Sequence, residues 1–581
     1  MSVSHSLTKQ SISRRSLMKG SAAAMTIPAF AGLGIMHRAN LASAQDGADF
    51  RMEYVNFPTL DPQFVTNGMW FAAEGLLEGL TKLENGGVDA VGAMAETWDV
   101  SEDGLTYTFH LRDAKWSNGD PVTSNDFIWT YQRLLTPSSA AAGVTLGANS
   151  FQPALGIVGA ADFFAGALEN WEEVGIKAPD EKTVEFTLEY ANAEFPHLIT
   201  HPSMLPLNQK NVESGDEWIM PGNIVTNGPF VPEAWEINAN IHLIPNEEYW
   251  ERAAVTVPGV FVNLAGEGSV AFEAGELDYV SLDAPSLERF QADPNMAERV
   301  HSAPAGNIGY LATLRSKNPI LEDLNIRKAL SMAIDRDIIG GVMPNTRPSA
   351  QLIPDSLAGW TDAENTPTDV DQAKQILADA GYPDGEGFPT VNLLYGGTNL
   401  AMEALADIWN QNLGINVNLD TVESGVYVER RWAVQEEDYI GFYTGTFGST
   451  PTWSTWVASL WSPQFISEFS LPADIWAEYQ TIQTNTDLTP AERNAQLEEL
   501  RLANRSPEAA AFDEAVVAAF AEPDPEAQQS ALREAAQIRM NSFLIIPVYQ
   551  VDAYYALAEG VGEIDYIQGG LHFYYKNFTK G

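Results

Sequence analysis

The chain has 581 residues, of which 45% are hydrophobic and 19% are charged, and its formal net charge is −46. This length is too great for one hydrophobic core, so we expect two or three packed lobes of a globular protein that is neither disordered nor membrane-spanning. The absence of cysteine excludes disulfides, thiolate nucleophiles, cysteine-based metal sites and a lipid anchor on an N-terminal cysteine, and the acidity argues against nucleic acid or an anionic membrane as partner.

The first 44 residues carry the features of an export signal. Arg14 and Arg15 stand just before the apolar stretch Gly20–Met36, a pattern that resembles the twin-arginine signature. The stretch is too short and too rich in small residues for a good membrane span. A small-x-small cleavage pattern ends at Ala44, so we expect a mature protein, beginning at Gln45, that is exported folded and is periplasmic, soluble and not lipid-anchored. An amphipathic N-terminal helix that stays attached is the alternative.

The first part of the mature chain predicts short strands and helices. Thr123, three residues before Asp126, forms a variant capping box that opens a helix, and Pro137 ends that helix. The expected elements are a strand over 50–57, a helix over 71–80, a strand over 106–111, a helix over 127–135 and strands over 184–188 and 241–244.

From about residue 320 onward, helices alternate with strands. The expected elements are helices over 326–334, 370–380 and 401–413 and strands over 391–395 and 415–419. This βαβ rhythm predicts an α/β lobe rich in parallel strands. No linker rich in glycine, proline or serine separates independent domains, so the lobes should pack closely and share strands.

Two stretches near the C-terminus resemble each other. Residues 475–500 and 512–535 each predict a helix, a break marked by Pro490 or Pro525, and a second helix. We interpret them as a duplicated helical hairpin, and coincidence between two amphipathic hairpins is the alternative.

Several motifs resemble the oligopeptide-binding family of ABC-transporter extracytoplasmic solute-binding proteins, family 5. They keep the family's order from about Leu60 to the C-terminus, and most belong to turns and strands of the scaffold. The matching segments are Ala95–Trp98, Tyr107–Arg112, Ala114–Thr123 with Asp126 and Phe127, His201–Met204, Pro221–Phe230, Glu276–Asp278, Ile326–Leu330 with Ile334–Ile339, Ala373 and Lys374 with Leu377–Tyr382, and Ile545–Tyr549.

The resemblance implies a fold and a division into domains. The fold is α/β, of the periplasmic-binding-protein type II-like (cluster C) kind, with a two-lobed cleft and an extra inserted domain. Domain I is split over residues 45–77, 208–309 and 545–581, domain II is an insertion over 78–207, and domain III is the hinged lobe over 310–544.

The resemblance also implies binding without chemistry. Family members hold extended peptides by strand-like backbone hydrogen bonds inside a closed cleft, and the ligand shifts the population from open to closed forms. We therefore expect no enzymatic activity, no cofactor and no bound metal. The implied partners are a peptide or small-molecule ligand and an ABC permease dimer with its ATPase subunits, and the family habit is to act as a monomer.

The loop that contacts the ligand's amino group departs from the family pattern. The family has an aspartate four residues before a proline, and counting back from Pro451 this chain has Phe447. A desolvated ammonium needs an anionic or multiply accepting partner, whereas phenylalanine offers at best a cation–π face. Either another acid takes over, or the ligand has no free N-terminus, as in an N-blocked or cyclic peptide, an opine-like compound or an oligosaccharide.

Further candidate ligand-binding residues follow from their place in the family pattern. Asn67, Met69 and Trp70 match an extended cleft-lining segment. Arg430 and Arg431 lie in the third domain, near the position where the family has a basic residue that reaches a ligand carboxylate, and a solvated helix face is the alternative.

The same loop contributes Tyr443, Thr444, Gly445 and Trp453 as candidates. Aromatic side chains are dense there, and we expect two or three of seven to touch ligand and the others to belong to the core. The seven are Tyr439, Phe442, Tyr443, Phe447, Trp453, Trp456 and Trp461.

A secreted hydrolase is the main rival class, and a sensory or chaperone-like protein without a transporter is another. The sequence contains no Gly-x-Ser-x-Gly elbow, no His-Glu-x-x-His motif and no P-loop. His197 and His201 have the spacing of a metal pair on a helix, but Pro196 and Pro202 disfavour a regular helix there.

Overall fold

The computed structural model describes residues 49–581 except 65–66, 88, 137–155, 315–317, 355–356, 358–366, 398, 424–425, 435–437, 448–451, 461–472, 486–487, 489, 523, 565 and 567–572. The predicted export signal, with Arg14, Arg15 and Ala44, lies outside these residues, as does Trp461. Within them, no helix has both the length and the apolar character needed to cross a membrane.

An antiparallel sheet in the first third of the chain has the strand order β4-β5-β7-β6. Every second residue of β5 is buried, as the predicted alternation requires. The predicted capping box is confirmed, because the Thr123 backbone N–H donates to Asp126 Oδ2 at 2.8 Å at the start of α4. The elements are β4 (Ala95–Val100), β5 (Thr106–Leu111), α4 (Ser124–Leu135), β6 (Ile176–Asp180) and β7 (Thr183–Thr187).

Helix α3 (Asn67–Gly75) differs from the prediction of a helix over 71–80. It begins earlier and ends at Gly75, and the chain then continues to β2 (Thr81–Glu84), which pairs with β3 (Asp89–Gly92). A Cβ at Gly75 would lie 2.5 Å from the Tyr575 ring, so a glycine is required where α3 meets the C-terminal segment. Glycine also disfavours continuation of a helix, which explains the early end.

The largest sheet has eleven strands among the described residues and contains segments from both ends of the chain. The strand expected over 50–57 is shorter, since β1 ends at Glu53, and the strand expected over 241–244 is confirmed within β9. The strands are β1 (Phe50–Glu53), β8 (Phe230–Glu236), β9 (Asn240–Pro245), β10 (Val260–Asn263), β11 (Tyr279–Leu282), β12 (Val300–Thr313), β13 (Thr346–Pro348), β14 (Val391–Gly396), β15 (Val417–Val422), β16 (Gly441–Phe447) and β17 (Ile545–Leu557).

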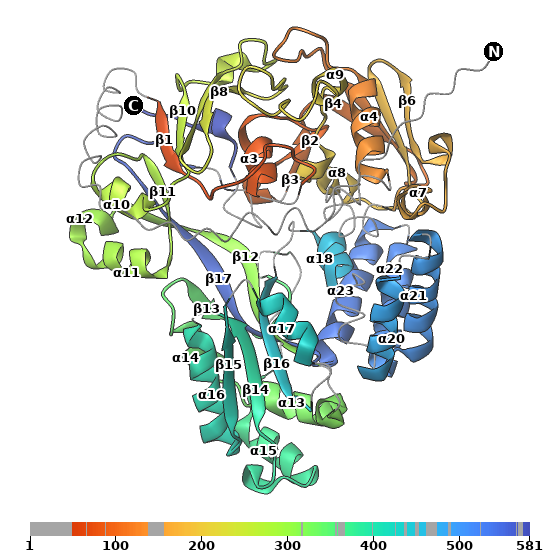
Figure 1. Cartoon of the computed structure of the whole chain (residues 1–581), viewed down its shortest axis with the longest axis vertical. Coiled ribbons are helices and arrows are strands. Elements are labelled where there is room, and N and C mark those ends of the chain that lie inside the picture. The colour runs from red at the N-terminus through yellow and green to blue at the C-terminus, as the bar shows by residue number, and fades with distance from the viewer. Residues whose placement is uncertain are drawn as a thin grey trace, which may run out of the picture. The chain divides into compact units, whose positions relative to one another are not determined.

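Two long strands, β12 and β17, form the middle of this sheet (Figure 1). They pair antiparallel over most of their length, with register shifts between Pro304 and Asn307 and between Gly309 and Tyr310. At Gly309 a Cβ would lie 2.3 Å from the Tyr549 ring, so the two strands approach closely only because position 309 is glycine. Strands β11, β1, β10, β9 and β8 follow on one side of this pair, and β16, β14 and β15 on the other.

The predicted βαβ rhythm is confirmed in the second half of the chain. Strands β14 and β15 pair in parallel and are joined by α16 (Leu400–Leu413), whose buried Trp409 donates its indole N–H to the Leu330 carbonyl at 2.9 Å. The expected helices over 326–334 and 370–380 are present as α13 (Leu324–Met332) and α15 (Val370–Asp379). Shorter helices elsewhere are α7 (Ala160–Ala165), α9 (Gln209–Val212), α10 (Gly268–Glu273), α11 (Ala284–Ala292), α12 (Pro294–Ala297) and α14 (Arg336–Gly340).

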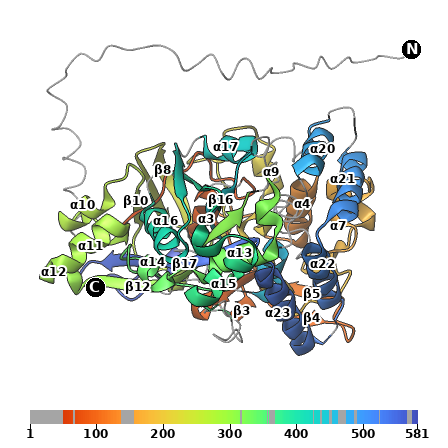
Figure 2. The same ribbon diagram turned by 90° about the horizontal axis from the view of Figure 1, so that it is seen from below.

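Both predicted helical hairpins are present (Figure 2). Each proline begins a second helix instead of standing in the break. Proline favours a first helical turn because its missing N–H would be unpaired there. Arg501 Nη1 and Arg505 Nη1 donate to Asp513 Oδ2 at 2.6 and 2.8 Å, which ties the first hairpin to the second. The helices are α20 (Ala473–Gln483), α21 (Pro490–Asn504), α22 (Pro507–Phe520) and α23 (Pro525–Asn541).

Candidate functional site

The segment expected as a ligand-binding loop begins as strand β16 (Gly441–Phe447), and this corrects the prediction for Tyr443, Thr444, Gly445 and Phe447. On one side β16 pairs with β12 through its whole length, ending with Phe447 opposite Ile308. On the other side β14 pairs only with residues 441–443. Among the described residues, no strand pairs with residues 444–447 on that second side, so this part of β16 is an open sheet edge.

Among the described residues, the unpaired backbone groups of this edge belong to Thr446, because the register with β14 ends at Leu394 and Tyr443. The Gly441 carbonyl accepts from the Leu314 N–H at 2.9 Å and therefore points toward β12. Since successive strand residues direct their backbone groups to opposite edges, residues 444 and 446 point away from β12. The Tyr427 hydroxyl, from α17 (Tyr427–Ala433), donates to the Thr444 carbonyl, so a side chain occupies one position of this edge.

Gly445 allows a tyrosine from the neighbouring strand to lie over β16. A Cβ at position 445 would be 2.5 Å from the hydroxyl oxygen of Tyr310. The Tyr310 ring also meets the Tyr443 ring edge-on, with the centroids 6.4 Å apart. Tyr310 was missed by the sequence analysis, because only the strand register places it opposite Gly445.

Both arginines of α17 have aromatic neighbours. Arg430 Nη2 lies 3.2 Å from Asp420 Oδ2, which also accepts from the Tyr439 hydroxyl at 3.1 Å. The Arg431 guanidinium lies over the Tyr443 ring, 4.6 Å from its centroid. The alternative of two arginines on a purely solvated helix face is therefore wrong. Whether Arg431 contacts a ligand stays a prediction.

Five of the seven aromatic residues near this strand are buried, as a role in the core requires. The backbone of Phe447 is described but its side chain is not, and Trp461 lies outside the described residues. The buried five are Tyr439, Phe442, Tyr443, Trp453 and Trp456.

Helix α18 (Trp453–Leu460) begins at a carboxylate from the first third of the chain. Glu194 accepts the backbone N–H of Trp453 at 3.0 Å and that of Ser454 at 2.6 Å. A negative charge at a helix N-terminus is favourable, because it meets unpaired N–H groups and the positive end of the helix dipole. No sequence motif marks Glu194 as a helix cap, since it is remote from α18 in the chain.

Asn67, Met69 and Trp70 lie in helix α3, so the expected extended segment is wrong for these residues. Met69 is buried. Trp70 is half-buried, and its ring meets the His201 ring edge-on at 5.7 Å between centroids. The side chain of Asn67 is not among those described, and contact of these residues with a ligand stays a prediction.

His197 and His201 do not share a regular helix. His197 lies in the four-residue helix α8 (Phe195–Leu198), while His201 precedes a 3₁₀ turn and its Nδ1 lies 2.7 Å from Ser203 Oγ. Burial lowers the pKa of His201 to about 3, because a charged imidazolium would be desolvated there. In the described part of the chain, no three metal-binding side chains come together.

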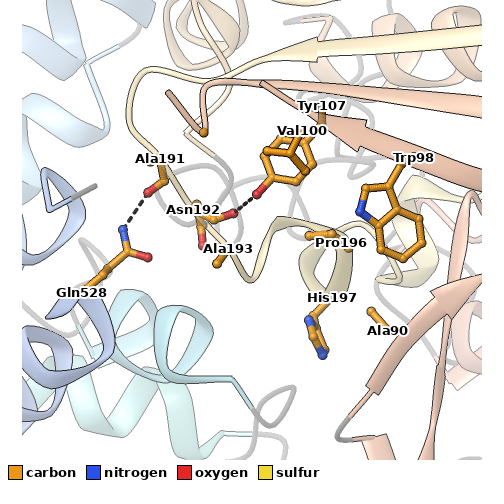
Figure 3. Close-up of a pocket in the computed structure, with 11 residues that line it drawn as sticks. Ala90, Trp98, Val100, Tyr107, Ala191, Asn192, Ala193, Pro196, His197 and Gln528 are labelled. Atoms are coloured by element: carbon orange, nitrogen blue, oxygen red, sulfur yellow. Dashed lines mark hydrogen bonds between the residues drawn. The ribbon is translucent and has the colours of Figure 1, made fainter. Parts of the chain in front are cut away.

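A cavity of about 320 Å³ lies apart from β16, between the β4–β5 end of the four-stranded sheet and helix α23 (Figure 3). Its lining is mostly apolar and comes from widely separated parts of the sequence, so no local pattern predicts it. Burial raises the pKa of Tyr107 to about 12, and its hydroxyl donates to the Asn192 carbonyl at 2.7 Å. The lining residues are Ala90, Trp98, Val100, Gly104, Tyr107, Ala191, Asn192, Ala193, Pro196, His197 and Gln528.

Comparison of the sequence with known proteins gives consistent matches. Residues 89–468 match the model of bacterial extracellular solute-binding proteins, family 5 Middle. The periplasmic oligopeptide-binding protein OppA of Escherichia coli K12 is 32% identical over 381 residues, which are 61% of this chain and 67% of that protein. The probable deoxycholate-binding periplasmic protein YgiS of the same organism is 31% identical over 396 residues, 64% of this chain and 71% of that protein.

Solved structures give the fold. The murein tripeptide-binding protein MppA of Escherichia coli superposes with a TM-score of 0.70 at 24% identity, over 92% of this chain and 98% of that one. Haemophilus influenzae OppA in complex with the peptide RPPGFSPFR gives a TM-score of 0.66 at 24% identity, over the same shares of the two chains. The chain therefore has the α/β fold of the type II periplasmic binding proteins, as the sequence analysis predicted.

Proposed function

The chain belongs to the bacterial extracellular solute-binding proteins, family 5, and from that premise we propose that it captures a peptide or peptide-like ligand and delivers it to an ABC importer. It performs no chemistry on the ligand. Its partners are a permease dimer with ATPase subunits, and the binding protein itself acts as a monomer. The relatives named as oligopeptide-, murein peptide- and dipeptide-binding proteins support a peptide as ligand.

The observation that carries this proposal is the open edge of β16. An extended peptide that adds to a sheet edge forms backbone hydrogen bonds that do not depend on its side chains. Thr446 presents such backbone groups where β14 no longer pairs with β16, while the Thr444 carbonyl already accepts from the Tyr427 hydroxyl. Tyr310 and Arg431 lie at the same strand through their contacts with Gly445 and Tyr443, and they would form the neighbouring walls.

Strands β12 and β17 act as the hinge between the lobes in this proposal. Strand β12 crosses the expected boundary near residue 310, where its register shifts fall, and β17 begins directly after the expected boundary near residue 544. Interrupted pairing lets a strand pair bend without losing the whole ladder. Domain III (310–544) would then close on domain I, with domain II (78–207) as the insertion.

The ligand's amino terminus is the point on which two candidate functions differ. With Phe447 at the family's aspartate position, an N-blocked peptide or a non-peptide ligand avoids an unpaired buried ammonium. The similarity to a relative named as probably deoxycholate-binding favours this second candidate. If peptides with a free N-terminus bind, another acidic group must accept the ammonium.

The place of action follows from the N-terminal sequence. The twin-arginine pattern at Arg14 and Arg15 and the cleavage pattern at Ala44 support export of the folded protein to the periplasm. The relatives named as periplasmic support the same location.

Native mass spectrometry of the gently purified mature protein tests the proposal. A ligand present at about a hundred times its dissociation constant adds roughly 2.7 kcal/mol to stability, so a tightly held ligand should survive purification. A set of peptides confirms the first candidate, and a single N-blocked or non-peptide mass confirms the second. Turnover of the released ligand on incubation with the protein would contradict a binding function.

A further inference from the structure

The cavity of about 320 Å³ beside α23 is separate from the open edge of β16. It is bounded by β4 and β5, by the connection 191–193, by α8 and by α23 (Figure 3). Its volume lies at the lower end of the range for small-molecule sites. No aspartate, glutamate, lysine or arginine lines it, and the one histidine among its described lining residues is His197.

Much of the cavity lining is apolar, and the polar side chains that line it include Asn192, His197, Gln528 and the indole of Trp98. Trp98 and Val100 of β4 form part of one wall, and 46% of the Val100 surface is exposed. Figure 3 shows the indole nitrogen edge of Trp98 on the cavity side, at the end opposite Gln528. The structure gives Trp98 Nε1 no acceptor among the described residues.

Gln528 supplies the polar atom at the other end. It is 3% exposed, and its Nε2 donates to the Ala191 carbonyl at 2.6 Å and to the Glu522 carbonyl at 3.2 Å. These two bonds fix the orientation of the amide, and Figure 3 shows its oxygen on the side away from Ala191. An amide oxygen held in one orientation at a cavity is a suitable acceptor for a ligand that donates a hydrogen bond.

We infer that this cavity binds a small neutral molecule, mostly apolar, with a hydrogen-bond acceptor at one end for Trp98 and a donor at the other for Gln528. A charged ligand is disfavoured, because no aspartate, glutamate, lysine or arginine lines the cavity to pair with it, and an unpaired buried charge is costly. Neutral aromatic amides with a phenolic hydroxyl have this combination of groups.

A molecule in this cavity touches both the four-stranded sheet and the helical hairpins. The adjoining segment already connects them, because Ala191 accepts from Gln528 and Glu194 caps α18. Binding therefore favours the arrangement in which these contacts are made, and by linkage the same arrangement favours binding.

Isothermal titration calorimetry with three matched probes tests the inference. We expect 4-hydroxybenzamide to bind with 1:1 stoichiometry. Benzamide lacks the donor for Gln528 and should bind about 3- to 10-fold more weakly, which is the usual effect of one lost hydrogen bond. The anion 4-hydroxybenzoate should show no measurable binding.

Two variants locate the binding. Ala193→Phe fills the cavity from an exposed position and should abolish binding, while Trp98→Phe keeps the aromatic wall but removes the donor and should weaken binding several-fold. Trp171→Phe, at a half-buried tryptophan of the same sheet region that does not line the cavity, is the matched control and should bind like the wild type. If Ala193→Phe does not fold, the comparison of the two tryptophan variants decides. The inference is overturned if neither neutral probe binds at up to about 5 mM, if the anion binds equally well, or if both cavity variants bind normally.

Discussion

His201 should make the protein less stable in acid, and replacing it should remove a defined part of that sensitivity. The imidazole is buried, its Nδ1 lies 2.7 Å from Ser203 Oγ, and its ring lies against Trp70. Burial is the cause that lowers its pKa from the ordinary 6.5 to about 3. Between these two pH values the unfolded chain binds a proton at this position and the folded chain does not.

The sign and size of the effect follow from this difference in proton binding. Stability rises with pH wherever the unfolded state binds more protons. The free energy of unfolding therefore falls as the pH drops below 6.5, and this fall levels off near pH 3. Each pH unit below the pKa of the unfolded state lowers the free energy of unfolding by about 1.4 kcal/mol. At pH 5 the neutral buried His201 therefore lowers the free energy of unfolding by about 2 kcal/mol relative to a residue that does not titrate.

Equilibrium urea denaturation of the wild type and of His201→Gln at pH 7 and pH 5 measures this contribution. We expect the loss of unfolding free energy between the two pH values to be about 2 kcal/mol smaller in the variant, whatever its stability at pH 7. His301→Gln, at an exposed histidine, is the matched control for the loss of an imidazole side chain. Equal pH dependence in the wild type and in His201→Gln, within about 0.5 kcal/mol, would refute the reasoning.

Three substitutions test the other parts of the site. Gly445→Ala places a Cβ against the Tyr310 hydroxyl and should lower the unfolding free energy by about 1–3 kcal/mol, and Tyr310→Phe in the same chain should recover part of it; no change on thermal denaturation would contradict the close approach. Glu194→Gln removes the negative charge at the start of α18 and should cost about 1 kcal/mol at low salt and less at high salt, and a salt-independent cost would argue against the charge. Phe447→Asp should raise the affinity for trialanine at least about tenfold in calorimetry without raising the affinity for N-acetyl-trialanine. An equal gain in affinity for both peptides would contradict the proposed contact with the amino group.

The parts of the fold that the sequence predicted are those fixed by local chemistry. Strand β5 follows from strict alternation, and α4 follows from the capping box of Thr123 and Asp126. The predicted bounds of helix α3 were wrong because the end of the helix depends on the contact of Gly75 with Tyr575, which is remote in the chain. The open edge of β16 was missed for a similar reason, since it exists only where its pairing with β14 stops.

The candidate site was predicted only where a family motif marks it. The motif led to Tyr443, Thr444, Gly445 and Phe447, but it described them as a loop, because short apolar runs with glycine and threonine do not distinguish a loop from a strand edge. Tyr310 and Tyr427 could not be found in this way, since strand register and an α17 contact bring them to β16. The cavity beside α23 depends entirely on tertiary packing.

The arrangement around β16 also explains how ligand preference could change in this chain without loss of the fold. Residues 448–451, outside the described part, are bounded by Phe447, paired with Ile308, and by the start of α18, capped by Glu194. Phe447, at the position that meets the ligand's amino group in the family, therefore stands between two features that do not depend on its side chain. These are the pairing of β16 with β12 and the capped start of α18. An aspartate there must be compensated electrostatically when no ammonium is bound, whereas a phenylalanine needs only an apolar neighbour. Exchanging one for the other alters which ligands are tolerated while the backbone hydrogen bonds of β16 and the cap of α18 persist.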